Sequence, residues 1–551
     1  MLLGIDVGGT FTDAVIIDKK RIISQAKSQT THGDILQGLL KVLDEVIKPL
    51  TDVGKVTRVS LSTTLITNLV ATGNLPKVAL GVIPGPGINC ENSFPVQPVV
   101  FEGYTDHRGE MVAASRLTKE QLAEMQQGDC AVVSAKFSVR NPASELALVE
   151  ELKVVGVNDI VQGHNVAGSL GFIRRTNSAY YTAATFQAFA DFMQAIQQAL
   201  AEYKITAPVY ALKADGGTMH VNDKFIAEHT VETYFTGPAA SAVGINALLR
   251  PQSRAISLDI GGTTTDIAFW EDGFPVQKLR GATINGYPTA VRALHLRSVA
   301  LGGDSVVRRS GDDIIIGPER LGAAVALGGT QPTLTDAFLV LNKAAFGDKA
   351  KAAEGLKSLL LAGESVQEFA QKVLHKALAM LEQEIQEMIY EYSLQPIYKV
   401  EDIVTDKVFT PELIIGVGGA AEGIVPSLAQ RLNLPVQVPQ SAVVANAVGA
   451  AVARPTLVAD LRADTATGVC TIVQQGTKER IERNFSLVDA QAMLTAWLQE
   501  QAKVNDIEFL GVQVVVQEEF PVVKGMRRLG KIINMTMQLA AGVLTEVKEA
   551  E

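Results

Sequence analysis

The pattern of apolar and polar positions repeats at two distant places along the chain. Residues 4–13 and 257–266 each begin with an apolar run that contains β-branched residues. Each run leads into Asp-x-Gly-Gly-Thr, and a second apolar run follows at residues 14–17 and 267–270. Two apolar strands joined by a tight turn that needs glycine form a β-hairpin with a polar tip. The sequence therefore predicts two similar hairpins.

The tips of the two predicted hairpins carry residue types that bind phosphate. Glycine lets backbone N–H groups close on an anion, threonine hydroxyls add donors, and an aspartate can hold a hydrated Mg²⁺. Asp-Gly-Gly-Thr is also ordinary turn chemistry, which is the alternative for a single copy. The two copies match at Asp, Gly, Gly, Thr, Thr and Asp in the same order, which favours phosphate binding. Two such hairpins suggest two similar domains that face one nucleotide.

A third glycine-rich stretch lies at residues 412–423. An apolar strand enters a turn that contains Gly416, Gly418 and Gly419, and this turn opens a helix. Such a turn lets the backbone lie flat against a nucleotide, although alone it is often only a close packing contact. The order of hairpin, hairpin and glycine turn strengthens the nucleotide interpretation.

The predicted elements divide the chain into five segments. Strands alternate with helices at the beginning of the chain, and proline and glycine at residues 84–87 and 95–98 interrupt this pattern. A long helix at about residues 178–203 returns the chain to the core, and a second helix at residues 365–393 has one apolar face. The segments are the N-terminal part of the first domain (1–83), an inserted lobe (84–176), the return to the core with substrate-side motifs (177–253), the second domain with the adenosine loop (254–455), and a small α+β C-terminal lobe (456–551).

Composition narrows the classes of partner and compartment. A net charge of −10 argues against nucleic acid, because phosphate backbones require a basic surface. Three cysteines stand far apart, so neither a disulfide framework nor a thiolate metal site is indicated. The chain has no secretory apolar segment near its start and no apolar run long enough to span a bilayer. We expect a cytoplasmic protein that acts away from membranes.

Five motifs carry a resemblance to a known family. They are residues 62–68 (Ser-Thr-Thr-Leu-Ile-Thr-Asn), 215–219 (Asp-Gly-Gly-Thr-Met), 231–240, the second hairpin, and 332–337 (Pro-Thr-Leu-Thr-Asp-Ala). With these motifs, residues 1 to about 455 resemble the actin, Hsp70 and sugar-kinase superfamily and, within it, the hydantoinase/oxoprolinase A-subunit family. The resemblance implies an α/β protein with two ribonuclease-H-like domains, an inserted lobe and a small α+β C-terminal lobe, with ATP between the domains.

The resemblance also implies roles for individual residues. Asp6 and Asp259 would face each other across the cleft as the catalytic pair and organise Mg²⁺ on the β- and γ-phosphates of ATP. Gly418 and Gly419 would lie against adenosine. Asp13 and Asp266 are expected to brace the hairpins. The residues expected to hold phosphate oxygens are Gly8, Gly9, Thr10, Thr12, Gly261, Gly262, Thr263 and Thr264.

The activity that the resemblance implies is ATP-dependent opening of a cyclic amide, such as a lactam, 5-oxoproline or hydantoin. ATP would phosphorylate the amide oxygen, and a B-type subunit would complete the hydrolysis, or a carboxylation in related members. We also expect an oligomer. Two alternatives from the same superfamily are an ATP-driven reactivase or chaperone-like switch and a small-molecule kinase.

Residues near the predicted substrate depart from the family pattern. Asn68 matches a family asparagine, but Asp304 replaces a glycine, and the turn at residues 418–423 lacks the family histidine. Asp215 stands where the family usually has asparagine, so it either contacts a metal or cationic substrate or forms a plain Asx turn. Thr236 is the expected cap of the helix at residue 237, and all four are candidates for substrate contact.

Two other pairs leave alternatives open. Thr63 or Thr64 either caps the next helix or contacts substrate, with capping the commoner role for such residues. Arg174 and Arg175 either clamp an anionic substrate or form a solvated pair, which is the usual state of exposed charges.

Overall fold

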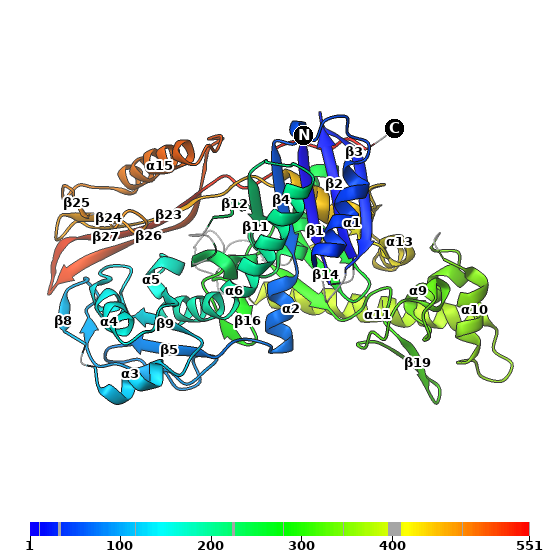
Figure 1. Cartoon of the computed structure of the whole chain (residues 1–551), viewed down its shortest axis with the longest axis horizontal. Helices are drawn as coiled ribbons and strands as arrows, with labels where there is room; N and C mark the ends of the chain where they lie inside the picture. Colours follow the sequence, from blue (N-terminus) through cyan, green and yellow to red (C-terminus); the bar gives the residue numbers. More distant parts are fainter. Residues whose placement is uncertain are drawn as a thin grey trace.

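The computed structural model describes residues 1–9, 11–30, 35–115, 117–222, 226, 228–278, 280–344, 347–394, 409–476 and 478–549. Two α/β domains form its centre, and two smaller lobes lie on one side of the first domain (Figure 1). Thr10 lies outside the described residues, so its expected phosphate contact stays a prediction.

The first domain is built on a sheet of six strands in the order β12-β11-β4-β1-β2-β3. Strand β1 pairs antiparallel with β2 and parallel with β4, and β4 pairs parallel with β11. The N-terminal hairpin thus joins two antiparallel strands beside a parallel set. The strands are β1 (Leu2–Val7), β2 (Phe11–Asp18), β3 (Arg21–Gln29), β4 (Arg58–Thr63), β11 (Val209–Leu212) and β12 (Thr218–His220).

The second domain repeats this arrangement in the order β15-β14-β13-β21-β22, with β18 also paired to β14. Strand β13 pairs antiparallel with β14 and parallel with β21, as β1 does with β2 and β4. The repeat confirms the two ribonuclease-H-like domains that the duplicated hairpins predicted. The strands are β13 (Ala255–Ile260), β14 (Thr265–Glu271), β15 (Phe274–Pro275), β18 (Leu296–Val299), β21 (Leu413–Val417) and β22 (Val436–Gln437).

Two helices of small residues, α8 (Thr236–Leu249) and α14 (Ala445–Val452), pack against each other between the sheets. A Cβ on Gly244 would stand 2.1 Å from the Ala445 carbonyl oxygen, and one on Gly449 would stand 1.9 Å from that of Ala240. A Cβ on Gly4 of β1 would likewise stand 2.1 Å from the carbonyl oxygen of Ala447 in α14. Only glycine permits these approaches, so the two domains meet almost backbone to backbone.

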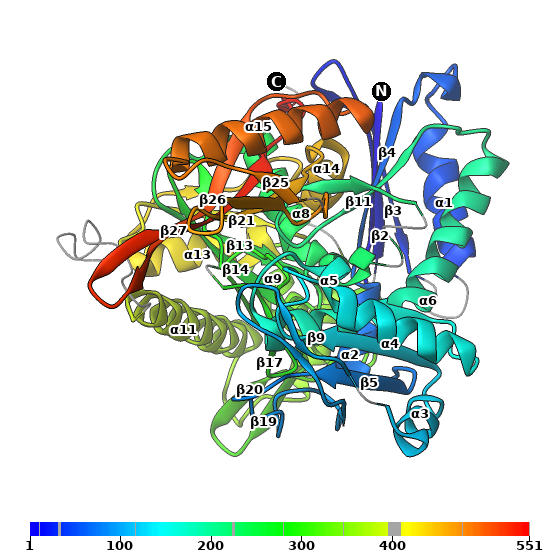
Figure 2. The ribbon, with the colours of Figure 1, turned by 90° about the vertical axis from the view of Figure 1, so that its left-hand side faces the viewer.

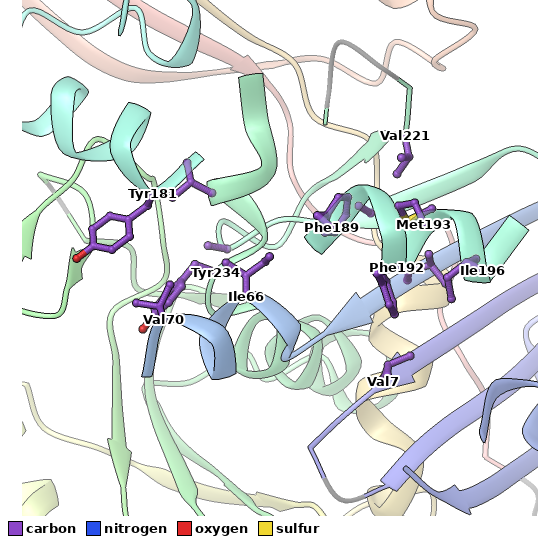
Figure 3. Packing of buried hydrophobic residues seen from close by; sticks show 14 of the residues in the cluster. Val7, Ile66, Val70, Tyr181, Phe189, Phe192, Met193, Ile196, Val221 and Tyr234 are labelled. Carbon is purple, nitrogen blue, oxygen red and sulfur yellow. The ribbon is translucent and has the colours of Figure 1, made fainter. Parts of the chain in front are cut away.

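The core of the first domain lies under the long helix α6 (Phe172–Glu202). Phe192, Met193 and Ile196 project from α6 toward the sheet, where Val7 ends β1 (Figure 3). Ile66 and Val70 reach the same cluster from α2 (Leu65–Thr72), while α1 (Ile35–Ile47) covers β2 and β3. The end of β1, which carries the first hairpin, is therefore held by a continuous apolar core.

The inserted lobe has its own parallel sheet in the order β10-β9-β5-β6. Strand β5 was expected in the first domain, but it pairs with β9, so the lobe begins before residue 84. The elements are β5 (Val78–Ile83), β6 (Val99–Val100), β7 (Tyr104–Thr105), β8 (Met111–Ala113), α3 (Lys119–Met125), β9 (Cys130–Ala135), α4 (Ala143–Val154), β10 (Ile160–Gln162) and α5 (Gly163–Val166).

Arg175 stabilises the junction between this lobe and α6. The side chain is fully buried and donates hydrogen bonds to the carbonyl oxygens of Ser169 and Ala135, at 2.7 Å each. Neither a solvated pair nor an anion clamp describes it, because a buried guanidinium must satisfy its donors inside the protein. The expectation for Arg175 was wrong, since α6 begins at Phe172 and carries it into the core.

Helices on the outer side of the second domain cover its sheet. The longest, α11, begins at Val366 after a capping box formed by Ser365 and Glu368, and its apolar face is buried as predicted. The remaining elements here are β16 (Thr283–Ile284), β17 (Tyr287–Pro288), β19 (Val307–Ser310), β20 (Asp313–Ile316), α9 (Leu334–Val340), α10 (Lys349–Lys357), α11 (Val366–Ser393) and α13 (Ala421–Leu432).

The C-terminal lobe is a five-stranded sheet with one helix on it, and its hairpin β26–β27 projects from the molecule (Figures 1 and 2). The chain then leaves this lobe at residue 540. In this C-terminal segment, residues 540–549, backbone N–H groups donate to carbonyl oxygens of other elements: Leu544 to Val452, Val547 to Ala247 and Lys548 to Lys20. The segment thus connects α14 and α8 with the turn between β2 and β3 in the first domain. The elements are β23 (Val458–Asp464), β24 (Val469–Ile472), β25 (Lys478–Arg480), α15 (Leu487–Val504), β26 (Val512–Lys524) and β27 (Arg527–Leu539).

Candidate functional site

The tips of the two hairpins have the same backbone geometry. The N–H of Gly8 donates to the carbonyl oxygen of Phe11 at 3.0 Å, and the N–H of Gly261 donates to that of Thr264 at 3.0 Å. The carboxylates occupy the same register, because Asp6 is paired with Asp13 and Asp259 with Asp266. Each hairpin therefore presents one closed turn with a pair of acids behind it.

Asp6 and Asp259 come from different domains and lie near enough to interact. Burial, together with the charges of Asp13 and Asp259, raises the pKa of Asp6 to about 7, and hydrogen bonds with Ser62 and Asn446 oppose this rise. Burial likewise raises the pKa of Asp259 to about 6, against the effect of Asn446, Lys27 and Ser241. Buried carboxylates with raised pKa values are typical of sites where a cation or phosphate chemistry will act.

The two carboxylates fit a divalent cation that is completed by phosphate. The Oδ1 atom of Asp6 is buried and has no hydrogen-bond partner among the described residues. No group of three or more His, Cys, Asp or Glu residues in the described ranges is arranged to hold a metal ion. Mg²⁺ is commonly bound by one or two carboxylates together with substrate phosphates and water, so two aspartates suffice for it.

The glycine turn after β21 adjoins the second hairpin. Gly418 has φ +93°, and a Cβ there would stand 2.6 Å from Oδ1 of Asp259 and 2.5 Å from the Ile260 carbonyl oxygen. Gly418 thus leaves room for the Asp259 carboxylate, and its expected contact with adenosine stays a prediction. Gly419 has nothing within 4 Å of its Cβ position, so the turn is open at Gly419.

Asn68 lies at the tip of the first hairpin. Its Nδ2 donates to Oγ1 of Thr64 at 3.3 Å and stands 3.4 Å from the Cβ position of Gly9. Thr63 accepts the N–H of Leu65 at 3.1 Å, so Thr63 rather than Thr64 caps the start of α2. The structure brings Asn68, Thr64 and the first glycine turn together.

Two predicted residues, Thr236 and Thr12, are engaged in hydrogen bonds within the protein, and so is Thr265, which matches Thr12 in the second hairpin. Thr236 does not cap α8; Phe235 holds that position with φ +64°, and the Thr236 hydroxyl donates to the Thr63 carbonyl oxygen at 2.6 Å. Thr12 is also buried, with its hydroxyl 3.1 Å from that of Thr30, so it braces the hairpin rather than facing phosphate. Thr265, at the matching position, donates to the Leu301 carbonyl oxygen at 2.6 Å.

Asp215 forms the Asx turn and also has cationic partners. It accepts the N–H of Gly217 at 3.0 Å and lies 3.0 Å from Arg292 and 3.6 Å from Lys213. The structure thus shows the Asx turn, whereas the cations beside Asp215 belong to the protein, and contact with a metal or a cationic substrate stays a prediction. This buried network supports the loop at the carboxyl end of β11.

Asp304, a candidate for substrate contact, lies beside the second hairpin, and its contact with substrate stays a prediction. Its Oδ2 stands 2.6 Å from the Cβ position of Gly262 and accepts from Nε of Arg320 at 3.2 Å. Burial raises its pKa, and Arg320 partly offsets this rise. Thr263 and Thr264 are exposed at the same tip.

Sequence reasoning missed Asn446, Lys27, Thr30 and Ser298. Asn446 stands near the start of α14 beside both Asp6 and Asp259, and Thr30 donates to the Gly8 carbonyl oxygen at 2.9 Å. A lone asparagine in a run of small apolar residues was the only signal for Asn446. Lys27 and Ser298 lie on β3 and β18, and Thr30 directly follows β3; the sequence does not reveal the register of these strands.

Comparison with known proteins places this site in a family. The model described as hydantoinase/oxoprolinase matches residues 175–458, just over half of the chain, and the N-terminal region of the same family matches residues 2–156. The chain belongs to the hydantoinase/oxoprolinase family. This confirms the resemblance drawn from the motifs.

Individual relatives are distant and include two kinds of enzyme. The caprolactamase subunit alpha of Pseudomonas jessenii is 22% identical over 78% of this chain and 67% of its own length. The acetophenone carboxylase gamma subunit of Aromatoleum aromaticum is 25% identical over 62% of this chain, which spans about half of that subunit (53%).

Solved structures share the fold across nearly the whole chain. Nucleotide-free acetone carboxylase has a TM-score of 0.71 at 18% identity, covering 99% of this chain and 88% of its own. ATP-dependent caprolactamase from Pseudomonas jessenii has a TM-score of 0.68 at 18% identity, covering 97% and 87%. Both of these solved structures are described as ATP-dependent enzymes, and both of the relatives above are named as subunits. Among the helices in the described residues, none has the length and apolar character to cross a membrane.

Proposed function

We propose that this chain binds one Mg-ATP between its two hairpins and phosphorylates the carbonyl oxygen of a cyclic amide. The observation that supports the proposal is the matched pair of hairpins, with Asp6 and Asp259 contributed by different domains and close enough to interact. The N–H groups of Gly8 and Gly261 close the two turns, so the backbone N–H groups of Gly9 and Gly262 would hold phosphate oxygens, and the open face of Gly419 would admit adenosine. Phosphoryl transfer is mainly positioning and charge neutralisation, which such a site supplies.

The two aspartates would hold Mg²⁺, which neutralises charge on the β- and γ-phosphates when bound. Asn446 keeps both carboxylates in place from α14. Asn68 and Thr64 stand next to the first tip, so they are placed to orient the amide whose oxygen attacks the γ-phosphorus. The pair Thr63–Thr236 fixes β4 to α8 beneath them.

The chemistry requires two tasks. The amide oxygen forms a bond to the γ-phosphorus while the bond to the bridging oxygen breaks and ADP leaves. Water then adds to the activated carbon, the C–N bond breaks to give an amine and an acyl phosphate, and a second water releases phosphate and leaves a carboxylate. The second task needs a general base or a metal-bound hydroxide near the carbon.

We assign this second task to a separate B-type subunit. In the described part of the chain, His164 is paired with Glu145 and His229 with Glu232, while burial lowers the pKa of His295 to about 4. The first two side chains are engaged with carboxylates, and His295 stays neutral at physiological pH. The relatives named as subunits support a partner of this kind.

Carboxylation is the second candidate, because two of the similar proteins are carboxylases by name. It would use the same ATP site and differ in the acceptor and the partner. The two candidates share the first task, so product analysis separates them.

The test is to measure phosphate release and product in parallel, with cyclic amides, with ketones plus bicarbonate, and with each candidate partner subunit. The proposal expects slow ATP hydrolysis by the chain alone and ring-opened product only when the partner is present. Stoichiometric ring opening by the chain alone would contradict the division of labour. Turnover that responds to a protein partner without any small product would favour an ATP switch.

A further inference from the structure

Each hairpin is paired with a third strand, and there the two domains differ. In the first domain Asp6, Asp13 and Lys27 lie in one row across β1, β2 and β3. In the second domain Asp259, Asp266 and Ser298 form the matching row across β13, β14 and β18. The rows have the same acids, and only the first ends in a cation.

The row in the first domain lies on the face of its sheet that packs toward α14 and the second domain. Residues paired directly across antiparallel strands project to the same side of a sheet, so Lys27 shares a face with Asp13 and Asp6. On that face Val15 and Ile17 pack in the same cluster as residues of α14 and of the second domain. The Lys27 charge also lowers the pKa of Asp259 in the opposite domain, although burial dominates that pKa.

The ammonium group is held but still accessible. Its Nζ lies 3.0 Å from Oδ2 of Asp13 and 4.9 Å from the centre of the Phe11 ring, and the side chain is 35% exposed. Phe11 belongs to the turn closed by Gly8, so Lys27 reaches the tip. An ion pair this exposed contributes little stability, so a purely structural role does not explain why a lysine stands at position 27.

We propose that Lys27 contacts the γ-phosphate of bound ATP, with Asp13 holding the ammonium in position. The inference rests on the proposed ATP site and assigns the charge within it. An ammonium is a compact point charge that suits phosphate oxygens. Negative charge that develops on the transferred phosphoryl group is then neutralised by Lys27 of the first domain, because the matching position of the second domain is Ser298.

Two substitutions test the contact. Lys27→Met should weaken ATP binding by about 10- to 100-fold, the usual loss for one hydrogen bond to a charged group, and leave ADP binding nearly unchanged. Lys27→Arg should restore part of the difference. Lys19→Met is the matched control, because it removes a lysine at the exposed far turn of the β2–β3 hairpin.

A second variant separates phosphate contact from simple support of Asp13. Lys27→Met leaves Asp13 buried without its cation, so we combine it with Asp13→Asn, which removes that acid as well. If Lys27 contacts phosphate, the double variant still discriminates poorly between ATP and ADP. If Lys27 only neutralises Asp13, the double variant binds ATP like the wild type and the proposal is overturned.

The outcomes also distinguish this inference from the function beneath it. Wild-type protein that does not bind Mg-ATP in calorimetry would overturn both. Wild-type protein that binds Mg-ATP, with Lys27→Met showing the same preference for ATP over ADP, would overturn the role of Lys27 alone.

Discussion

The two hairpins are alike in backbone and unlike in the strand beside them. Both turns close with the same N–H to carbonyl bond at 3.0 Å, and both place two acids in register. The neighbouring strand contributes Lys27 in one domain and Ser298 in the other. A duplicated turn therefore supplies phosphate binding twice, while the flanking strands make the two halves chemically different.

The electrostatics follow from this difference. Burial raises the pKa of Asp13, but Lys27 offsets part of the rise. Burial, together with the charge of Asp259, raises the pKa of Asp266 to about 7, and only the hydrogen bond with the Ser298 hydroxyl opposes this rise. Asp13 of the first hairpin therefore has a lysine beside it, whereas Asp266 of the second hairpin does not.

The largest effect is expected from the acids that both hairpins share. Asp6→Asn and Asp259→Asn should each lower ATP turnover by about 100-fold or more, because each removes one charge from the Mg²⁺ site. Steady-state phosphate release and circular dichroism measure activity and folding. A normal rate in either variant would mean that the hairpin concerned does not serve the metal.

Moving the cation between the rows tests the asymmetry itself. The double variant Lys27→Ser with Ser298→Lys keeps the net charge but places the ammonium in the second domain. We expect turnover to stay about 100-fold below wild type, because the transferred group needs the charge from the first side. Recovery of the wild-type rate would show that only total charge matters.

The glycine turn after β21 adjoins the second hairpin and, among the described residues, has no counterpart beside the first. Substitutions in this turn should weaken binding of the nucleoside part of ATP. Gly419→Val places methyl groups in the open space beside the turn and should weaken ATP binding by about tenfold, with inorganic pyrophosphate unaffected. Gly418→Val is a poorer probe, since it would collide with Asp259. Competition binding measures both ligands, and equal losses for the two would show that the turn does not meet adenosine.

The smallest effect concerns stability without ligand. Because the folded-state pKa of Asp266 is about 7 and its ordinary value is 3.8, its destabilising effect is absent well below pH 4, grows as pH rises from about 4 to 7, and is complete above pH 7. Asp266→Asn should thus stabilise the protein by about 2 kcal/mol more at pH 8 than at pH 5. Asp13→Asn should gain less, because it also breaks the Lys27 pair. Urea unfolding at both pH values decides this, and a pH-independent difference would contradict it.

Much of the fold could be predicted because its local signals are strong. The hairpins β1–β2 and β13–β14, helix α11 and the family followed from apolar runs, glycine turns and motifs. The full length of strand β26 (Val512–Lys524) does not follow from the sequence, because Gln517–Glu519 break the apolar pattern of a strand that is largely exposed.

The details of the site could not be predicted for a different reason. Lys27 and Ser298 gain meaning only from strand register, and Asn446 only from the packing of α14 between the domains. Thr12 and Thr236 have the residue type that binds phosphate, but the pleat of β2 and the start of α8 turn their hydroxyls toward the protein. Residue type was thus predictable from the chain, whereas side-chain direction required the fold.

The most direct test of the central claim is hydrogen–deuterium exchange with and without saturating Mg-ATP, together with binding stoichiometry from calorimetry. One nucleotide per chain should protect the backbone N–H groups of residues 4–13 and 257–266 together. Asp6→Asn should weaken protection at both hairpins, because the same nucleotide joins them. Protection of one hairpin alone at saturation, or two nucleotides per chain, would contradict a single Mg-ATP held between the two domains.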